Sequence, residues 1–343
     1  MYSFLNDYSE GAHPDILAAL QSTNMEQTCG YGLDPYCEQA AETIRRKFQA
    51  DRSDIHFAVG GTQVNLLIIH ALLRSYEAVI SAETAHVSLH ETGAIEVTGH
   101  KVCTVPSPDG KLTPELVESV LNAHSSEHMV RPRLVYISDT TELGTLYTKA
   151  ELTALHDFCR EQDLLLFLDG ARLGSALTAE DNDLSPADLP RLTDVFTIGA
   201  TKNGALFGEA IVLSAQEVKP HFRWYMKQRG AILAKGRLLG IQFQILFRSD
   251  LYFDLARHAN AMAAKLRDGL LAQGYSFAAA PQSNQLFPIL PGPVVQSLHR
   301  TYQFDADRLM GDGSLCVRLV TSWATPEQAV DDFLRDLAAC SKK

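Results

Sequence analysis

The sequence predicts an α/β protein, in which helices cover both faces of a mostly parallel sheet and a smaller α+β unit follows. Two observations support this prediction. Short continuous apolar runs, such as residues 134–138 and 164–168, alternate with helical patterns, which is typical of strands buried on both faces. After about Gln242, one long helical stretch and a few strand-like pieces replace that alternation. The 343 residues are enough to bury a core of this size.

The helices are predicted from apolar residues at helical spacing and from residues typical of helix ends. The helix at 35–49 carries its basic residues late, where they suit the helix dipole. The helix that begins at Thr113 has Pro114 in its first turn. In chain order, the predicted helices cover residues 14–21, 35–49, 63–74, 89–98, 113 onward, 149–161, 251–272 and 326–339.

The strands are predicted from short apolar runs bounded by glycine or polar residues. The run at 55–59 leads into Gly60-Gly61, and the run at 195–198 stops at Gly199. In chain order, the predicted strands cover residues 55–59, 78–80, 102–105, 134–138, 164–168, 195–198, 210–213, 286–290 and 315–320.

The composition excludes several classes of protein. Apolar residues make up 46% of the chain and charged residues 21%, as in an ordinary soluble globular protein. The formal net charge of -11 argues against nucleic acid as a partner, because binding phosphates requires clustered Lys and Arg. No run approaches the roughly 18 apolar residues of a membrane span, so we expect no membrane partner.

Cysteine usage and the N-terminus indicate a cytoplasmic protein. The six cysteines form no CxxC pair, and the first residues lack the pattern of a secretory signal. His86 and His90 have helical spacing, but no third metal ligand is near them in the sequence. We therefore expect reduced thiols and no metal site.

Ligands of open α/β sheets bind beyond the carboxyl ends of the strands, and four candidate stretches lie there. The first, Gly60-Gly61-Thr62, offers backbone N–H groups and a hydroxyl to a phosphate; the alternative is a tight turn with a threonine cap. The second contains His86, which is able to stack on a planar ring or to move a proton. The alternative there is an ordinary core or surface histidine.

The other two stretches carry charge. Asp169 ends a buried strand, where an unpaired acid is costly, and one suitable partner is a protonated heteroaromatic nitrogen. Arg172 suits a carboxylate ligand, although a structural pair between Asp169 and Arg172 is an equal alternative. Lys202 lies among small and apolar residues, so desolvation would lower its pKa and free its amine as a nucleophile; otherwise it reaches solvent.

The order of the four stretches favours pyridoxal 5'-phosphate (PLP) as the cofactor. PLP requires a phosphate cradle, a flat group to stack on its ring, a partner for its pyridinium nitrogen and an amine for its aldehyde. The chain offers these in sequence as the glycine-rich turn, His86, Asp169 and Lys202.

Six motifs support this assignment and occur in a fixed order: "GYGLDP" (30–35), "VGGTQVN" (59–65), "AETAHVSLHETG" (82–93), "LDGARLG" (168–174), "TKNGALFGEA" (201–210) and "VRLVTSW" (317–323). Together they resemble the threonine aldolase and β-eliminating lyase group of fold-type-I PLP enzymes over nearly the whole chain. The resemblance implies a large PLP-binding domain at 15–245 with a mostly parallel seven-stranded sheet. It also implies a smaller α+β C-terminal domain at 246–343, joined by the N-terminal segment 1–14.

The resemblance implies cofactor contacts for five residues. Lys202 would form a Schiff base with PLP, Asp169 would pair with the pyridine nitrogen, and His86 would stack on the ring. Gly61 and Thr62 would hold the phosphate.

It also implies contacts with the substrate and with a neighbouring subunit. Arg172 and Arg318 would bind the substrate's α-carboxylate, with Asn6 close by. Tyr31 and a basic residue of segment 227–237, either Lys235 or Arg229, would enter the site from a neighbour. We therefore expect a homo-oligomer with shared active sites, either a dimer or a homotetramer.

One loop departs from the family's common pattern. After the strand at 134–138, common threonine aldolases carry a second histidine that contacts the substrate hydroxyl, whereas this chain has none in residues 139–144. Glu142 or Thr141 is expected in its place. The candidate catalytic bases are Glu142, His86 or a held water, and burial would raise the pKa of Glu142 toward the range that suits such a base.

The sequence thus predicts a cytoplasmic, PLP-dependent aldehyde-lyase that cleaves a β-hydroxy-L-α-amino acid, of the threonine or allo-threonine type, to glycine and an aldehyde. The alternative is β-elimination or transamination of another L-amino acid, because only the substrate pocket distinguishes these reactions. The presence of Lys202, Asp169 and both arginines disfavours a non-catalytic protein on this scaffold. The missing glycine fingerprint disfavours a nicotinamide-dependent dehydrogenase.

Overall fold

Seven strands form the central sheet of the computed structural model. The structure describes residues 1–340, and of Asp307 it describes the backbone but not the side chain. Six strands run parallel, and β8 runs antiparallel to both of its neighbours. This confirms the predicted mostly parallel seven-stranded sheet. Across the sheet the strands are β2 (Asp54–Ala58), β8 (Glu209–Leu213), β7 (Val195–Gly199), β6 (Leu165–Asp169), β5 (Arg131–Ser138), β3 (Glu77–Ala82) and β4 (Val102–Val105).

The helices that accompany this sheet begin at the residue types expected of caps. The Asp34 carboxylate accepts from Cys37 N ahead of α2, and Thr148 and Glu151 form a capping box at the start of α6. The helices are α1 (Pro14–Ser22), α2 (Pro35–Phe48), α3 (Gly61–Leu72), α4 (His86–Leu89), α5 (Pro114–Ala123), α6 (Lys149–Glu161), α7 (Leu173–Thr178), α8 (Leu189–Leu192), α9 (Phe222–Gln228) and α10 (Arg237–Phe247), with 3-10 turns at Glu96–Thr98 and Gln216–Val218.

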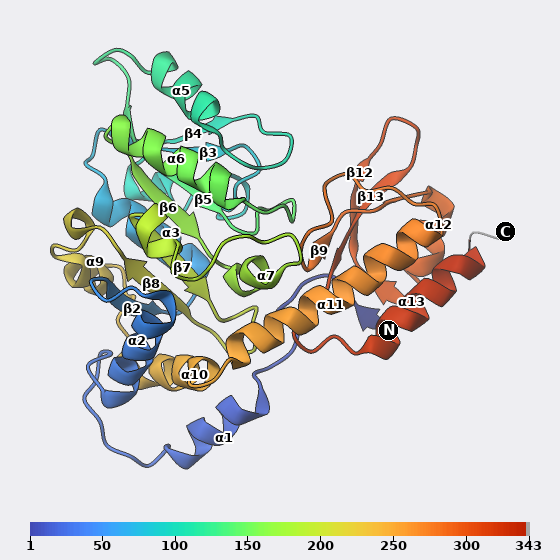
Figure 1. The fold of residues 1–343 in the computed structure, drawn as a ribbon, viewed down its shortest axis with the longest axis horizontal. Coiled ribbons are helices and arrows are strands. Elements are labelled where there is room, and N and C mark those ends of the chain that lie inside the picture. The colour runs from blue at the N-terminus through green and yellow to red at the C-terminus, as the bar shows by residue number, and fades with distance from the viewer. Residues whose placement is uncertain (341–343) are drawn as a thin grey trace.

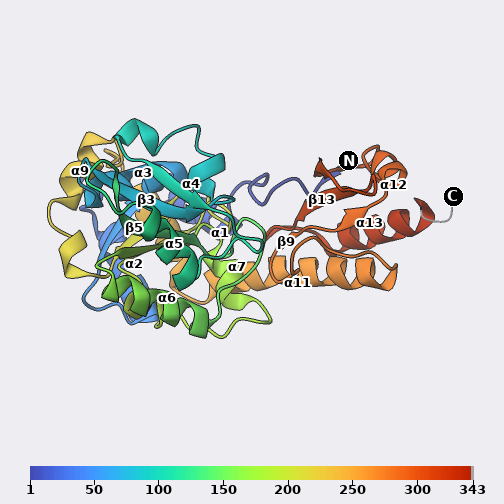
Figure 2. The same ribbon diagram turned by 90° about the horizontal axis from the view of Figure 1, so that it is seen from above.

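Two helical layers enclose the sheet, as its continuous apolar strands predict. Helices α2, α5, α6 and α10 pack on one face in a core that includes Phe196 and Phe243. Helices α3 and α9 pack on the other face around Phe167 and Phe222. Figure 2 shows α3 and α9 on one side of the strands and α2 and α6 on the other. Helices therefore cover both faces of the sheet, and the edge formed by the strand ends is the place where a ligand can bind.

The predicted helix at 89–98 is wrong. The chain there forms only the short α4 and a 3-10 turn, with an irregular stretch between them. Thr92 and Gly93 both adopt positive φ angles, 52° and 73°, which a right-handed helix does not allow. This break brings Glu91 back toward the start of α4, where it matters for the active site.

The smaller C-terminal domain packs a mixed set of strands against three helices (Figure 1). Its core contains Phe304, Leu319 and Phe333, all buried. The predicted strand-like piece at 286–290 is divided in two around Phe287 and Pro288. The elements are α11 (Leu251–Ala272), β9 (Gln285–Leu286), β10 (Ile289–Leu290), α12 (Gly292–Leu298), β11 (Tyr302–Gln303), β12 (Asp305–Leu309), β13 (Leu315–Val320) and α13 (Glu327–Cys340).

The N-terminal segment belongs to both parts of the molecule. Strand β1 (Tyr2–Ser3) pairs with β11, and the Phe4 ring is fully buried in the small-domain core. A few residues later, His13 N donates to Gly204 O of the large domain. The boundary predicted between residues 245 and 246 stays a prediction. The hydrophobic core changes inside α11, where Leu255 packs with the large domain and Leu266 with the small one.

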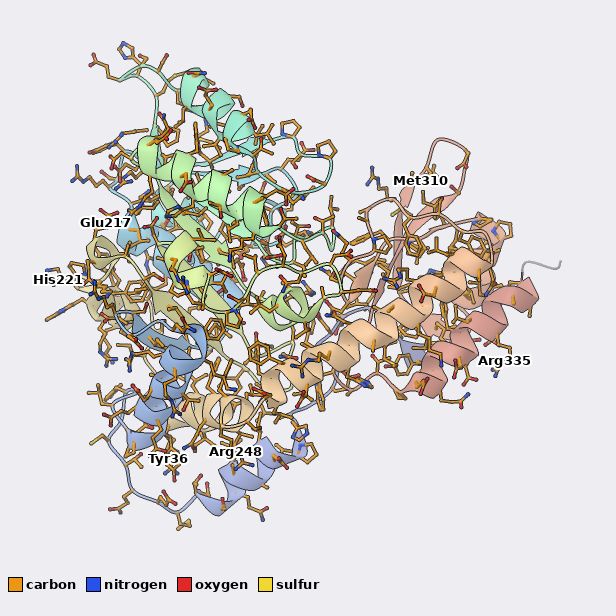
Figure 3. All side chains as sticks on the ribbon, in the orientation of Figure 1. Tyr36, Glu217, His221, Arg248, Met310 and Arg335 are labelled. Atoms are coloured by element: carbon orange, nitrogen blue, oxygen red, sulfur yellow. The ribbon has the colours of Figure 1, made fainter. Side chains whose placement is uncertain are left out.

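Charged side chains lie on the outer surface beside exposed apolar ones such as Met25 and Trp224. Glu217, His221, Arg248 and Arg335 are exposed and point away from the body of the molecule (Figure 3). Of the helices in residues 1–340, none combines the length and the apolar character needed to cross a membrane.

Candidate active site

Two adjoining cavities lie at the carboxyl edge of the sheet. One, of about 320 Å³, borders the strand-to-helix turn after β2, and the other, of about 510 Å³, extends to the small domain. Parallel strands end at this edge, so the residues that follow them converge there. The residues that line both cavities are Tyr8, His86, Glu142, Arg172 and Lys202.

The start of α3 offers the smaller cavity a site for an anion. Gly60 caps the helix without any side-chain hydrogen bond, so the first N–H groups of the helix have no side-chain acceptor. A Cβ atom built on Gly60 or Gly61 would meet no atom within 4 Å, which shows that open space lies against this backbone. Thr62 lines the same space. Free N–H groups at a positive helix end suit a phosphate, as predicted for Gly61 and Thr62.

Asp169 is held rigidly at the end of β6. Its Oδ2 accepts from the Tyr136 hydroxyl at 2.6 Å and from Asn65 Nδ2 at 3.0 Å, and its Oδ1 accepts from Ala171 N at 2.9 Å. The side chain is 6% exposed and lines the smaller cavity. A buried carboxylate with three donors is well placed to receive one more proton-bearing partner from the cavity.

A chain of hydrogen bonds connects Asp169 to His86. Asn65 Nδ2 donates to both Asp169 and Glu91 Oε1, and Glu91 Oε1 also lies 2.8 Å from His86 Nδ1. Because a carboxylate only accepts, this contact holds the hydrogen on Nδ1 and leaves Nε2 to other partners. The two residues predicted to touch opposite parts of a PLP ring are thus oriented by one buried network.

Glu142 closes this network on the other side. Its Oε1 accepts from His86 N at 2.9 Å and from Ser138 Oγ at 2.8 Å. Burial raises the pKa of Glu142, and these hydrogen bonds oppose the rise. Oε2 has no partner among the described residues and is left to exchange a proton. Thr141, the alternative to Glu142, instead bonds Thr145 at 2.6 Å and lines neither cavity.

Lys202 carries an unpartnered amine. Its Nζ forms no hydrogen bond or ion pair with any residue of the described chain, and the side chain lines both cavities. Burial and the Arg172 guanidinium lower the pKa of Lys202, whereas the carboxylates of Asp7, Asp169 and Glu209 favour the charged form. The arrangement fits an amine that reacts with a carbonyl group.

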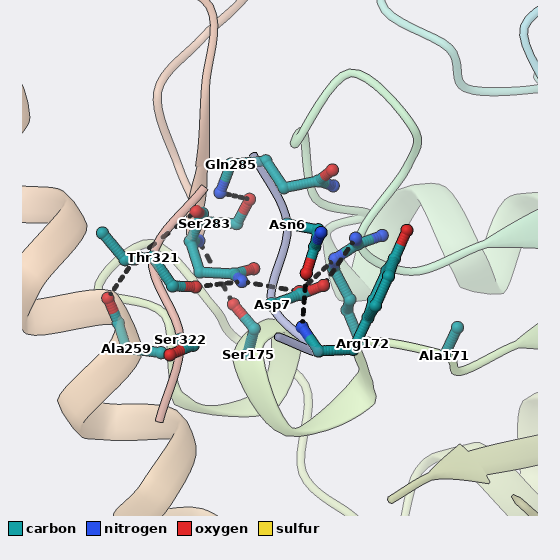
Figure 4. Close-up of polar contacts among 12 residues, drawn as sticks. Asn6, Asp7, Ala171, Arg172, Ser175, Ala259, Ser283, Gln285, Thr321 and Ser322 are labelled. Atoms are coloured by element: carbon teal, nitrogen blue, oxygen red, sulfur yellow. Dashed lines mark hydrogen bonds and ion pairs between the residues drawn. The ribbon is translucent and has the colours of Figure 1, made fainter. Parts of the chain in front are cut away.

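Arg172 differs from Lys202 in being firmly paired. Its Nε donates to Asp7 Oδ2 at 2.7 Å and its Nη2 to Asp7 Oδ1 at 3.0 Å, as Figure 4 shows. Asn284 Nδ2 also donates to Asp7 Oδ2, at 2.9 Å. The Asp169–Arg172 pair considered from the sequence does not form; Asp7 is the partner instead. Within residues 1–340, Nη1 of Arg172 is without a partner, so one end of the guanidinium remains for a ligand.

Arg318 reaches the larger cavity from the small domain. Its Nη2 donates to Gln285 Oε1 at 2.8 Å, and its Nη1 lies 3.4 Å from Asp305 Oδ2. Burial and the nearby Arg172 lower the pKa of Arg318. Asn6 lies beside Arg172 in Figure 4, but it lines neither cavity, and its Oδ1 accepts from Tyr8 N at 3.0 Å.

The structure does not bring Tyr31 and Lys235 to Lys202 within one chain. Tyr31 lines a separate cavity of about 440 Å³, where Arg223 Nη2 donates to its carbonyl oxygen. Lys227 lies 4.7 Å from the centre of its ring. Neither Lys235 nor Arg229 lines the cavities around Lys202. Their entry from a neighbouring chain stays a prediction.

Sequence reasoning missed several residues of the site. Glu209 begins β8, and because β8 is antiparallel, its start lies at the edge where the other strands end. Asp7 and Glu91 are brought in by the N-terminal segment and by the break after α4. The "GEA" triplet after Lys202 was the available signal, since an acid at the start of a buried apolar run needs an explanation.

Comparison with known proteins agrees with this geometry. The family model of β-eliminating lyases matches residues 4–290. The chain is 33% identical to the low specificity L-threonine aldolase of Pseudomonas aeruginosa, in an alignment that covers 97% of this chain and 96% of that protein. It is 28% identical to the low specificity L-threonine aldolase of Escherichia coli O157:H7, over 60% of this chain and 64% of that protein.

Solved structures show the same relationship. The threonine aldolase of Leishmania major superposes with a TM-score of 0.97 at 50% identity, covering 99% of both chains. An aspartate aminotransferase mutant of Thermus thermophilus superposes with a TM-score of 0.72 at 18% identity, over 99% of this chain and 91% of that one, which shows a shared fold. The family match includes every lining residue of the two cavities except Asp305 and Arg318. By fold, site and sequence, this chain belongs to the β-eliminating lyase family.

Proposed function

We propose that this protein is a PLP-dependent aldehyde-lyase that cleaves L-threonine, L-allo-threonine or a similar β-hydroxy-L-α-amino acid to glycine and an aldehyde. One observation carries the proposal: a single cavity joins the free amine of Lys202, the buried carboxylate of Asp169, His86 and the open start of α3. The aldolases of Pseudomonas aeruginosa and Leishmania major support the choice of reaction. They do not favour β-elimination or transamination as the main activity.

The residues present fit PLP. The start of α3, with Gly61 and Thr62, would hold the phosphate, Asp169 the pyridine nitrogen, His86 the ring face and Lys202 the aldehyde. When bound, PLP supplies an aldehyde for an amine and a ring that withdraws electrons from the bond broken at Cα.

The protein's own residues orient the substrate and move its proton. Nη1 of Arg172 and the guanidinium of Arg318 bind the α-carboxylate, because both arginines line the larger cavity. Glu142 takes the proton of the substrate's β-hydroxyl on Oε2, while two donors fix Oε1. Its raised pKa allows it to return that proton later in the cycle.

We also propose a cytoplasmic homotetramer built from dimers that share their sites. Tyr31 and Lys235, or Arg229 in its place, would then contact the neighbour's cofactor, with Asn6 near the substrate. The exposure of Tyr31, at 47%, and the six free cysteines of the chain support a partner surface and a reducing compartment.

The test is to record the visible absorption of the purified protein with PLP, before and after addition of L-threonine or L-allo-threonine. We expect a band from bound PLP that changes on addition, with aldehyde and glycine released in equal amounts. A band that does not respond, with no aldehyde, would contradict the proposed reaction. Formation of a keto acid and ammonia would show β-elimination instead of aldol cleavage. Formation of a keto acid with the amino group left on the cofactor would show transamination instead.

A further inference from the structure

Glu209 is a buried carboxyl group in the smaller cavity that the proposed reaction does not use. It is the first residue of β8 and pairs in register with Gly199 of β7 and Ala58 of β2. The antiparallel course of β8 brings this position to the edge of the sheet where Asp169 and Lys202 lie. All three side chains line the same cavity.

The carboxylate of Glu209 has no partner of its own. The residue is 5% exposed, yet no described residue donates a hydrogen bond to its side chain or forms an ion pair with it. Removing an acid from water costs several kcal/mol unless something compensates for it. The positive charge of Lys202, which also lacks a direct partner, favours the ionised form of Glu209 and offsets part of this cost.

We propose that Glu209 is a positioning residue that controls whether Lys202 carries its proton, and hence when its amine is free to react. This inference rests on the proposed role of Lys202 as the reacting amine. As a carboxylate, Glu209 stabilises the ammonium form across a cavity of low dielectric. As a neutral acid, it leaves the amine uncharged and nucleophilic.

Asp7, Arg172 and Tyr252 keep their charge states over the pH range in which Glu209 changes its own. Arg172 keeps its charge, and Asp7 keeps its own because its pairing with Arg172 lowers its pKa despite full burial. Burial raises the pKa of Tyr252, so its hydroxyl stays neutral. Burial, together with repulsion from Asp169, raises the pKa of Glu209 to about 8, while Lys202 opposes that rise. The groups that face the pair are Asp7, Asp169, Arg172 and Tyr252.

The experiment measures how fast Lys202 is acetylated by acetic anhydride in the cofactor-free full-length protein, as a function of pH. Mass spectrometry of the Lys202 peptide gives the rate, and the exposed Lys101 serves as the internal reference. In Glu209→Gln, the ammonium group of Lys202 loses its nearby carboxylate. The midpoint of the curve of Lys202 acetylation rate against pH should therefore move to lower pH. A shift of one pKa unit makes labelling about tenfold faster below the midpoint.

A matched control separates this effect from damage to the sheet. Asp194 is equally buried and lies just before β7, at the opposite edge, where its Oδ2 accepts from Leu166 N. Asp194→Asn should leave the Lys202 midpoint unchanged. An unchanged or raised midpoint in Glu209→Gln would overturn the proposal, as would an equal shift in the control.

The wild-type protein provides a second test if Glu209→Gln does not fold. Two coupled groups that titrate in the same range give a curve broader than that of one proton. A one-proton curve for Lys202 would contradict the proposal. These readouts do not require turnover, so a protein that fails to cleave threonine but shows the shift would disprove the reaction and leave the Lys202–Glu209 coupling in place.

Discussion

The two ends of the active-site cavity are built in different ways. The cofactor end, with Gly61, Asp169 and Lys202, comes from one edge of one sheet. The substrate end brings together Asp7 of the N-terminal segment, Arg172 of the large domain and Arg318 of the small domain. A rigid sheet therefore positions the first group, whereas the second depends on how three parts of the chain pack together.

This difference suggests where each end is vulnerable. Asp169 ends a strand and Lys202 follows one, and both strands are hydrogen-bonded on both sides, so single changes at these two residues should act on chemistry rather than on shape. The substrate end depends on contacts such as that between Asp7 and Asn284, 277 residues apart, so changes there should act on binding. Four substitutions test this contrast, in order of decreasing effect on catalysis, and the third also predicts a pH dependence of stability.

Lys202→Ala should have the largest effect. It removes the only reacting amine that we propose, so turnover should fall by about 10⁴-fold or more, the scale seen when a nucleophile is deleted. The visible band of bound PLP should be lost, while circular dichroism keeps its native shape. Normal rates in this variant would refute the role given to the cofactor end.

Glu142→Gln should come next. Loss of a general base lowers kcat by about 10²- to 10⁴-fold, and KM should stay within about twofold, because the amide keeps the shape of the side chain. In the wild type, activity should rise as pH increases through the raised pKa of Glu142, where the base loses its proton. The variant should lack this acid limb. An unchanged rate and pH profile in the variant would show that Glu142 is not the base, and His86 or a held water would then be the remaining candidates.

Asp7→Asn should act mainly on the substrate end. Arg172 loses its charged partner and can turn away, so KM should rise about tenfold, equivalent to roughly 1.4 kcal/mol of binding, while the band of bound PLP stays unchanged. Asp15→Asn, which breaks an exposed ion pair with Arg248 in the same part of the chain, is the control and should alter KM less than twofold. A loss of the PLP band in Asp7→Asn would show that the two ends are not separable.

The same pair predicts a pH dependence of stability. The folded-state pKa of Asp7 is lowered, so its contribution is complete above the ordinary carboxyl pKa and is lost as pH falls through the lower folded value. Denaturant unfolding of the wild type and of Asp7→Asn should therefore differ at pH 7 and converge at strongly acidic pH.

Phe4→Leu should have the smallest effect on catalysis. Phe4 anchors the N-terminal segment in the small-domain core, and a shorter apolar side chain should lower the free energy of unfolding by about 1 kcal/mol. Activity should stay within about twofold, because Asp7 keeps its own contacts. A rise in KM as large as that of Asp7→Asn would show that the anchor itself controls the substrate end.

Most of the cofactor end could be predicted from the sequence. The strand-end rule located His86, Asp169 and Lys202, because parallel strands carry their following residues to one edge. Local signals located the elements as well: the predicted helices at 149–161 and 251–272 agree with α6 and α11 residue for residue. Caps and apolar periodicity are properties of neighbouring residues, so they are visible without a fold.

Such local signals did not predict the substrate end, nor the hydrogen bonds that connect Asp169 to His86. Nothing near Arg172 in the sequence indicates that its partner is Asp7, 165 residues away. Glu209 was not identified because we searched the residues that follow each strand. Since β8 is antiparallel to its neighbours, its first residue, and not its last, lies at that edge of the sheet. Glu91 was placed in a helix that Thr92 and Gly93 interrupt.

The sequence by itself determined the alternation of strands and helices, the mostly parallel seven-stranded sheet and the family to which the chain belongs. These depend on local propensity and on motifs that keep their spacing. The tertiary structure alone decided which polar groups come together: Arg172 with Asp7, His86 with Glu91, and Lys202 with Glu209 in one cavity. The physical reason is that the strength and even the sign of an electrostatic effect depend on distance and burial, and only the folded chain sets both.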